Sequence, residues 1–324
     1  MKKDEGRQGK VLKERFINRR GVREAINGYV FIAPFLIGVI IFQIYVFASG
    51  FYYSFTDAQG LNPPSWIGLA NYKQLIHEIL TGGEFWRAIR VTFIYELGCL
   101  ATQIPVAFVL AFVLNSLPFK KLQNILRAAF FVPVLINTII VAWLFRQLFN
   151  PDQGLINWLL GVFGYHTRID WLQNQTLAPI LLIIVSFWQW TGFHMVYFVS
   201  QLQTIDPNLY EAAKIDGATP SQILLRITLP LMRPAVAYVM VTSAVGGLLV
   251  FDVIFMLFGG SSIGIFGPGN SAKALVPYIF DKAFTSEFRL GLASAAGWLT
   301  FLIIMIVNIF QMKVIGLGAS REEE

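Results

Sequence analysis

Residues 206–230 have the sequence DPNLYEAAKIDGATPSQILLRITLP, a polar stretch that separates two long apolar runs. Asp206 and Pro207 are typical of a helix start, because Asp accepts hydrogen bonds from free backbone N–H groups and Pro suits the first helical turn. Gly217 favours the left-handed conformation that ends a helix. The pattern therefore predicts one short helix between Asp206 and Gly217.

A second short helix is predicted to follow at once. Thr219, Pro220 and Gln222 form the pattern of a capping box, with Pro at the first helical position. This helix is expected to end before Pro230, where the next apolar run begins. Two helices of this length cannot span a bilayer, which takes about 20 residues. They are predicted to lie in water at the membrane surface, where a partner protein can dock.

The composition is that of an integral membrane protein. Of the 324 residues, 56% are hydrophobic and only 14% are charged, whereas a soluble domain is about a quarter charged. The single cysteine, Cys99, lies inside an apolar run, so neither a disulfide nor a cysteine metal site is expected. The net charge of +6 does not indicate nucleic-acid binding, because the basic residues gather at the N-terminus and in particular loops.

Six apolar stretches are long enough to cross a bilayer. They are residues 29–53, 91–114, 126–149, 177–200, 235–258 and 290–312. The first is not expected to be a cleaved signal peptide, because it is long, starts late and lacks a small-residue cleavage pattern. The predicted fold is an all-α integral membrane protein with six transmembrane helices.

Charge sets the predicted orientation of these spans. Residues 1–27 contain nine Lys or Arg and four acids, which places the N-terminus in the cytoplasm by the positive-inside rule. Alternation then puts the loops 115–125 and 201–234 and the C-terminus on the same side. This topology assigns 17 of the 25 Lys and Arg residues to the inner side. Both termini and the stretch 206–230 are therefore predicted to be cytoplasmic.

The motifs EAA at 211–213, DGA at 216–218 and ITLP at 227–230 resemble the EAA loop of permease subunits of binding-protein-dependent ABC importers. In that family the loop sits in a cleft of the cytoplasmic ATPase. The resemblance implies a fold of the type I importer permease, with the loop as its coupling helix. It also implies that the following residues couple the chain to an ATPase: Tyr210, Glu211, Ala212, Ala213, Asp216, Gly217, Ala218, Leu229 and Pro230.

The chemistry of this coupling loop suits the transmission of force. Glu211 offers a carboxylate to a partner Arg, and Gly217 supplies a bend that a side chain would resist. Ala212 and Ala213 are small enough for a partner backbone to approach. Capped helices continuous with the fifth span can act as levers, whereas flexible loops would absorb the movement.

Segments outside the coupling loop resemble sugar permeases of the oligosaccharide-uptake subfamily, which includes maltose, multiple-sugar and glycerol-phosphate systems. These segments are GLANY at 68–72, LFNP at 148–151, GLIN at 154–157 and YIFDKAF at 278–284. The loop 259–270 is longer and more irregular than the Gly-Gly-Pro turn of such relatives.

The resemblance implies a set of partners in a bacterial or archaeal cytoplasmic membrane. They are a second homologous permease, two ATP-binding cassette subunits that hold ATP and Mg, an extracytoplasmic solute-binding protein, an oligosaccharide and membrane lipid. The chain divides accordingly into a basic tail at 1–28, a first span and outer loop at 29–90, a permease core of five spans at 91–312 and a tail at 313–324.

No enzymatic activity is expected of this chain itself. The sequence has no Walker motif, and no Gly-Lys-Ser/Thr follows the Gly-rich loop, so ATP hydrolysis is assigned to separate subunits. The three histidines, His77, His166 and His194, lie in different segments without metal-ligand spacing. Neither a metal nor another cofactor is therefore expected on this chain.

Polar and aromatic residues within the spans are the candidates for the substrate pathway, because polar groups in a membrane usually face a cavity or another helix. Aromatic faces stack on sugar rings, and hydroxyls and amides bind sugar hydroxyls. Packing or interfacial anchoring remains an alternative role for these side chains. The candidates are Ser186, Gln189, Trp190, Phe193, His194 and Tyr197 in the fourth span, Ser243 and Gly247 in the fifth and Asn137 in the third.

Glu96 and Asp252 are ionisable residues well inside the spans. A proton-coupled secondary sugar transporter would use such acids as relays, and this class is the alternative to the importer. A membrane-embedded enzyme would need clustered acids, which the spans lack. The expected function is half of the pathway of an ATP-driven importer for an oligosaccharide, neutral or acidic, or a related polyol.

Overall fold

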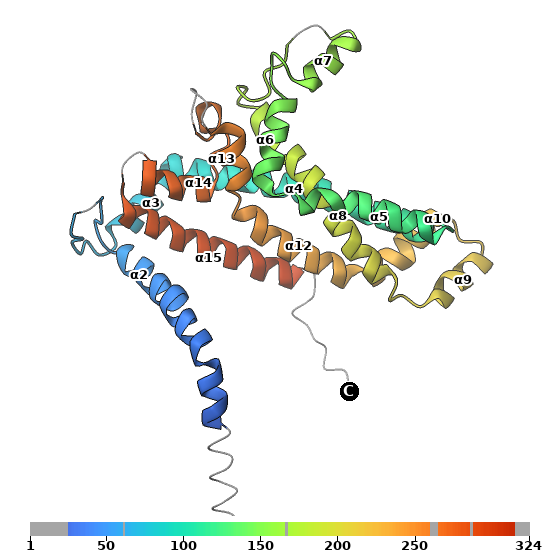
Figure 1. Cartoon of the computed structure of the whole chain (residues 1–324), viewed down its shortest axis with the longest axis horizontal. Helices are drawn as coiled ribbons and strands as arrows, with labels where there is room; N and C mark the ends of the chain where they lie inside the picture. The colour runs from blue at the N-terminus through green and yellow to red at the C-terminus, as the bar shows by residue number, and fades with distance from the viewer. Residues whose placement is uncertain (1–24, 61, 166–167, 260–264, 286–287, 315–324) are drawn as a thin grey trace, which may run out of the picture.

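The structure is a computed structural model in which nearly all regular structure is helical (Figure 1). It describes residues 25–60, 62–165, 168–259, 265–285 and 288–314. Four sequence features lie wholly or partly outside the described residues: the basic tail up to 24, His166, positions 260–264 of the Gly-rich loop and the C-terminal tail from 315.

Long helices that run side by side form the body of the structure (Figure 1). They are α4 (Glu84–Ser116), α5 (Lys120–Leu135), α8 (Leu177–Leu202), α12 (Arg233–Leu248) and α15 (Leu290–Val314). α4 and α8 pack along each other, α5 packs on α8, and α12 lies between α4 and α15. α4 and α8 are thus the centre of the bundle.

Shorter helices lie at the two ends of this bundle and on its sides. They are η1 (Ile40–Ile44), α2 (Tyr45–Tyr53), α3 (Ala70–Thr81), α6 (Thr138–Leu148), α7 (Leu155–Val162), α9 (Pro207–Ile215), α10 (Pro220–Ile223), η2 (Leu224–Thr228), α11 (Leu229–Leu231), α13 (Asp252–Phe258), η3 (Pro268–Asn270), α14 (Leu275–Phe280) and η4 (Asp281–Thr285). α9 and α10 lie at one end, and α3 and α14 lie at the other (Figure 1).

Each predicted span has a counterpart among the described residues. Four single helices are long and apolar enough to cross a membrane: Ala25–Tyr53, Glu84–Ser116, Leu177–Leu202 and Leu290–Lys313. Two more segments reach this length only as bent pairs of helices, which brings the number of candidate spans to six.

The first span stands apart from the bundle (Figure 1). None of the most apolar part of Ala25–Tyr53 is buried in the chain. Its C-terminal part contacts α15, where the rings of Phe47 and Phe51 lie 4.5 and 4.8 Å from that of Trp298. The remaining apolar surface requires contact with lipid or another protein subunit, because water would leave it poorly solvated.

The predicted span at 126–149 is present but sharply broken. α5 ends at Leu135 and α6 begins at Thr138, and the two axes differ by 94°. Pro133 lacks the N–H that would continue the hydrogen-bond ladder. Asn137 then starts the next helix, because its side chain accepts a hydrogen bond from the Ile139 N–H at 2.9 Å.

The predicted span at 235–258 is also broken. α12 ends at Leu248, residues 249–251 are not helical, and α13 begins at Asp252. Phe251 marks the break with φ −143° and ψ −59°. The neighbouring Gly246 and Gly247 weaken the last turn of α12, since glycine is a poor helix former.

The sequence predicts that the helix after the capping box ends before Pro230, and this prediction is wrong. Helical structure continues from Pro220 to Leu231 and then bends by 67° into α12. η2, a π-helical turn, precedes Pro230, and such turns accommodate a missing backbone donor. The link from the coupling loop to the fifth span is helical but angled.

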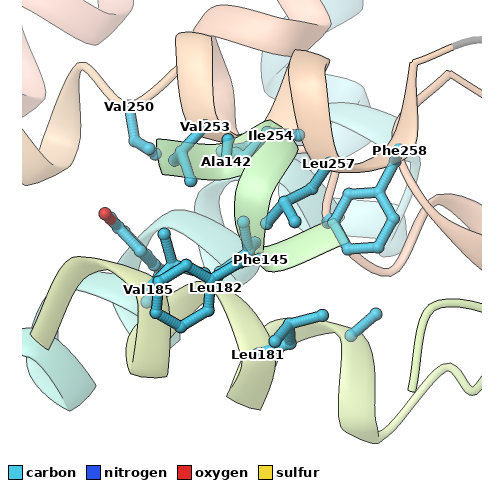
Figure 2. Packing of buried hydrophobic residues seen from close by; sticks show 14 of the residues in the cluster. Ala142, Phe145, Leu181, Leu182, Val185, Val250, Val253, Ile254, Leu257 and Phe258 are labelled. Carbon is cyan, nitrogen blue, oxygen red and sulfur yellow. The ribbon is translucent and has the colours of Figure 1, made fainter. Parts of the chain in front are cut away.

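A buried apolar cluster joins the broken helices to the central bundle. Its side chains include Ala142, Phe145, Leu181, Leu182, Val185, Val253, Ile254 and Leu257, from α6, α8 and α13 (Figure 2). Arg146 of α6 also donates a hydrogen bond to the carbonyl of Gly259 at 2.7 Å, which caps the C-terminal end of α13. α6 and α13 are thus held together as one unit.

Candidate functional site

A cavity of about 340 Å³ opens between α4, α8, α12 and the break before α13. Its wall combines aromatic rings, hydroxyls, amides and two acids. The lining residues are Tyr95, Glu96, Cys99, Gln103, Thr138, Ser186, Gln189, Trp190, Phe193, His194, Thr242, Ser243, Gly246, Gly247, Leu249, Val250, Phe251, Asp252 and Val253.

Hydrogen bonds fix the polar side chains of α8 at this cavity. The hydroxyls of Ser186 and Tyr95 lie 2.5 Å apart, which ties α8 to α4. Gln189 donates to the carbonyl of Ile136 and to the hydroxyl of Thr138, both at 3.1 Å. The Gln189 amide therefore supplies a hydrogen bond to a backbone carbonyl that the break between α5 and α6 leaves without a helical partner.

His194 connects three helices next to the cavity. Its Nε2 atom lies 3.2 Å from Oε1 of Gln103 on α4 and 3.4 Å from Oγ of Ser243 on α12. The side chain is buried. These contacts orient the imidazole, which lines the cavity and also holds the side chains of Gln103 and Ser243 in place.

An aromatic surface completes the cavity. Trp190 and Phe193 pack edge to face, with ring centroids 6.1 Å apart, and both rings are about two-fifths exposed. Exposed aromatic faces of this kind suit contact with the apolar face of a sugar ring, and their own pairing holds them in place.

Seven of the nine sequence-based candidates for the pathway meet at this cavity. They are Ser186, Gln189, Trp190, Phe193, His194, Ser243 and Gly247. Two others have different positions in the described structure: Asn137 caps α6, and Tyr197 stacks on Tyr238 at 5.0 Å outside the lining.

The sequence-based set of candidates omits several lining residues. Glu96, Gln103 and Asp252 all face the cavity. A charged residue inside an apolar span is a signal that could have placed Glu96 in the set. Gln103 has no such signal, because its partner His194 lies on a helix that is distant in sequence.

The coupling loop has the local geometry that its sequence predicts. The carboxylate of Asp206 accepts from the Asn208 N–H at 2.9 Å. The capping box is formed, with the Thr219 N–H donating to Oε1 of Gln222 at 2.8 Å. Gly217, between the two helices, has a φ of +75°.

One hydrogen bond joins α9 to the helix that leads into the fifth span. The Thr228 hydroxyl donates to the Tyr210 hydroxyl at 3.4 Å. Ala213 is buried against its own chain, whereas Glu211 and Ala212 are exposed. A partner protein can therefore reach Ala212 but not Ala213.

The other coupling-loop candidates lie around this contact. Asp216 and Gly217 are exposed at the tip, and the Ala218 N–H closes the C-terminal turn of α9 by donating to the Ala213 carbonyl at 2.9 Å. Leu229 is 38% exposed and Pro230 is exposed as well. The tip thus presents apolar and acidic groups together.

A buried ionic cluster lies at the opposite end of the bundle. Lys273 is 4% exposed and forms ion pairs with Glu84 and Asp281, and Lys282 lies 3.0 Å from Glu84. Burial alone would raise the pKa of Asp281, but hydrogen bonds from Lys273 and Thr285 lower this pKa below its ordinary value. The cluster anchors the segment that follows the Gly-rich loop to α4.

Within the described residues, no group of three or more His, Cys, Asp or Glu side chains is arranged to hold a metal ion.

Membrane-spanning helices around a cavity lined by aromatic and polar side chains, with two capped helices at one end of the bundle, define a helical membrane permease. The chain belongs to the family of binding-protein-dependent transport system inner membrane components, which it matches over residues 103–314. This is the family that the coupling-loop motifs predict. Transport by the family depends on a binding protein, and its members lie in the inner membrane.

Several curated relatives align over almost the whole chain. The arabinooligosaccharides transport system permease protein AraP of Bacillus subtilis is 32% identical over 291 residues, which cover 89% of this chain and 88% of AraP. The multiple sugar-binding transport system permease protein MsmF of Streptococcus mutans is 32% identical, with 90% and 97% covered. These relatives are transport permeases and not enzymes.

A solved structure has the same fold. It is a bacterial ABC transporter involved in import of the acidic polysaccharide alginate, with a TM-score of 0.78 at 24% identity. The alignment covers 94% of this chain and 99% of that chain. The predicted all-α fold of the type I importer permease is confirmed.

Proposed function

We propose that this chain is one of two homologous permease subunits of an ABC importer that carries an oligosaccharide or a related polyol into the cell. The cavity carries the proposal, because its wall pairs exposed aromatic rings with fixed hydroxyls and amides. Sugars need both, since they have apolar ring faces and many hydroxyls. The relatives named for arabinooligosaccharides and for multiple sugars support the same class of substrate.

The cavity forms part of the pathway between the two permease subunits. Trp190 and Phe193 contact the sugar rings, and Ser186, Gln189 and Ser243 bind sugar hydroxyls. A solute-binding protein delivers the sugar from outside the cell. The first span, which buries almost nothing in its own chain, packs against lipid or the second permease.

The coupling loop docks on one of two ATP-binding cassette subunits in the cytoplasm. This orientation places both termini in the cytoplasm and the ionic cluster of Lys273 on the outer side. ATP and Mg bind to those separate subunits, and this chain needs no cofactor of its own. Closure of the ATPases moves α9, and the hydrogen bond between Tyr210 and Thr228 passes the movement to the helix that leads into α12.

Reconstitution tests this proposal. The chain is co-expressed with its partner subunits, purified and placed in vesicles with the solute-binding protein and a panel of oligosaccharides. We expect at least one oligosaccharide to enter the vesicles and to stimulate ATP hydrolysis. Uptake that needs a proton gradient but no ATP would instead establish the alternative, a proton-coupled secondary sugar transporter using Glu96 or Asp252.

A further inference from the structure

The carboxyl group of Glu96 is buried in the cavity wall without being fully hydrogen-bonded. Glu96 is 4% exposed, and its Oε1 atom has no hydrogen-bond partner among the described residues. The other oxygen, Oε2, fits against Gly247, where an added Cβ atom would lie only 1.5 Å away. Close packing thus holds the carboxyl group between α4 and α12, at the surface of the cavity.

A buried polar atom without a partner is costly and calls for an explanation. Glu96 is not a structural ion pair, since no Lys or Arg lies among the described residues of the cavity wall. We infer that Glu96 is a specificity-determining residue, which binds a hydroxyl of an uncharged oligosaccharide and disfavours acidic ones. The inference rests on the proposed function and deepens it by choosing between neutral and acidic substrates.

Hydrogen-bond chemistry supports this choice. A sugar hydroxyl both donates and accepts, so it pairs with Glu96 whether the carboxyl group is ionised or protonated. The carboxylate of an acidic sugar only accepts. An ionised Glu96 would face it with two acceptors and no proton between them, and the two negative charges would repel each other. With Glu96 protonated, the acidic sugar would still enter a poorly solvated wall that has no Lys or Arg to balance its charge.

The other charged groups of the cavity act in the same direction. Asp252 adds a second carboxylate at the exposed edge of the cavity. His194 is already engaged with Gln103 and Ser243, so it is not arranged as a free cation for an acidic sugar. The wall therefore offers hydroxyls, amides and aromatic rings to either kind of sugar, but it offers no Lys or Arg to the charge of an acidic one and faces that charge with two acids.

The test measures binding of sugars to the purified complex of permeases and ATPases. The solute-binding protein is left out, so that its own preference does not enter. The probes are maltotriose, arabinotriose and trigalacturonate, and the readout is calorimetry. We expect at least one neutral trisaccharide to bind about tenfold more tightly than trigalacturonate, the size of one hydrogen bond to a charged group.

Two substitutions of the acid separate its roles. Glu96→Met keeps an unbranched side chain but removes the acceptor, and it should weaken binding of the neutral trisaccharide about tenfold. Glu96→Gln keeps an acceptor and removes the charge. It should largely retain the affinity for the neutral trisaccharide and reduce the difference between this affinity and that for trigalacturonate. Asp152→Asn removes an exposed carboxylate outside the cavity and should leave both affinities unchanged.

Trigalacturonate binding as tightly as the neutral sugars would overturn the inference while leaving the proposed function intact. Unchanged neutral binding in Glu96→Met would do the same. If Glu96→Met does not assemble with its partners, Glu96→Gln alone tests the inference. A difference in affinity between the neutral trisaccharide and trigalacturonate that is the same in Glu96→Gln as in the wild type overturns the inference. If the wild-type complex neither binds nor imports any oligosaccharide, the proposed function fails together with the inference.

Discussion

Gly192 of α8 packs directly on the main-chain carbonyl of Phe130 in α5. A Cβ atom on Gly192 would lie 1.7 Å from this oxygen, so the two helices approach as closely as their backbones allow. Small residues permit such approaches between membrane helices, where van der Waals packing supplies much of the stability. The contact places α5, and with it the break before α6, against α8, which carries five of the nineteen residues of the cavity wall.

The first prediction concerns this helix contact. Gly192→Ala should push α5 away from α8 and lower the free energy of unfolding by about 1–3 kcal/mol, the usual cost of overpacking. The midpoint of thermal unfolding in detergent measures it. Gly161→Ala is the control, because nothing lies within 4 Å of the added Cβ there. Equal midpoints for the two variants would show that the backbones are not in contact.

The second prediction concerns the contact between Gly247 and Glu96. Gly247→Ala should displace the carboxyl group, because the new Cβ would overlap Oε2. A displacement of about 1 Å at a binding group can cost up to a hundredfold in rate, so we expect uptake by reconstituted vesicles to fall at least severalfold. Gly297→Ala adds a Cβ in open space on α15, outside the cavity, and should cost much less. Similar losses in both variants would contradict the prediction.

Local signals in the sequence are strong enough to predict the ends of the coupling helices. Asp206, Thr219 and Gly217 act on backbone within a few residues, and the structure has the predicted caps. The apolar runs likewise predict six spans. They do not predict the breaks at Asn137 and at Phe251, because hydrophobicity alone is the same in a straight and in a broken helix.

The cavity depends on contacts that no single stretch of sequence reveals. The sequence identifies seven of its lining residues, because polar and aromatic residues stand out within an apolar span. Gln103 and Thr138 join the wall only because α4, α6 and α8 pack together. Tyr197 lies seven residues after Trp190 and therefore on the same side of α8, yet its ring stacks on Tyr238 of α12. The packing of the neighbouring helix, and not the spacing of residues along α8 alone, decides which side chains face the cavity.

The third prediction concerns Gly217 at the tip of the coupling loop. Its φ of +75° lies in the left-handed region, which Pro cannot adopt. Gly217→Pro should leave the protein inserted but separate ATP hydrolysis from uptake, so that the number of sugars imported per ATP falls about tenfold or more. Gly217→Asn is the matched control, since Asn tolerates this conformation. Normal transport by Gly217→Pro would count against the lever role of the loop.

Glu211 provides an independent test of the same docking surface. The residue is exposed on α9, so Glu211→Lys should not disturb the fold. Reversal of its charge should repel a cationic partner group and reduce co-purification of the ATPase, whereas the free energy of unfolding should change by no more than about 0.5 kcal/mol. Lys214→Glu on the same helix shows whether charge reversal alone weakens docking. Undiminished ATPase binding by Glu211→Lys would exclude the proposed contact.

The last prediction concerns the ionic cluster of Lys273. Because the pKa of Asp281 is lowered in the folded protein, its contribution to stability is present above the ordinary pKa of about 4 and is lost as the pH falls through the lowered value. The protection of residues 265–285 from hydrogen exchange, measured relative to the intrinsic exchange rate at each pH, should therefore fall below about pH 4. Asp281→Asn should lower the protection of residues 265–285 already at pH 7, and this protection should then depend less on pH.

Lys273→Met tests the cluster from the other side. It removes the buried cation between Glu84 and Asp281, which should destabilise the protein by about 3 kcal/mol. This is the lower end for a broken buried pair, because Glu84 is partly exposed and keeps its ion pair with Lys282. Asp152→Asn breaks an exposed ion pair with Arg168 and should cost less than about 1 kcal/mol. Thermal unfolding of the two variants compares these costs, and equal midpoints would mean that Lys273 is solvated and not buried between the acids.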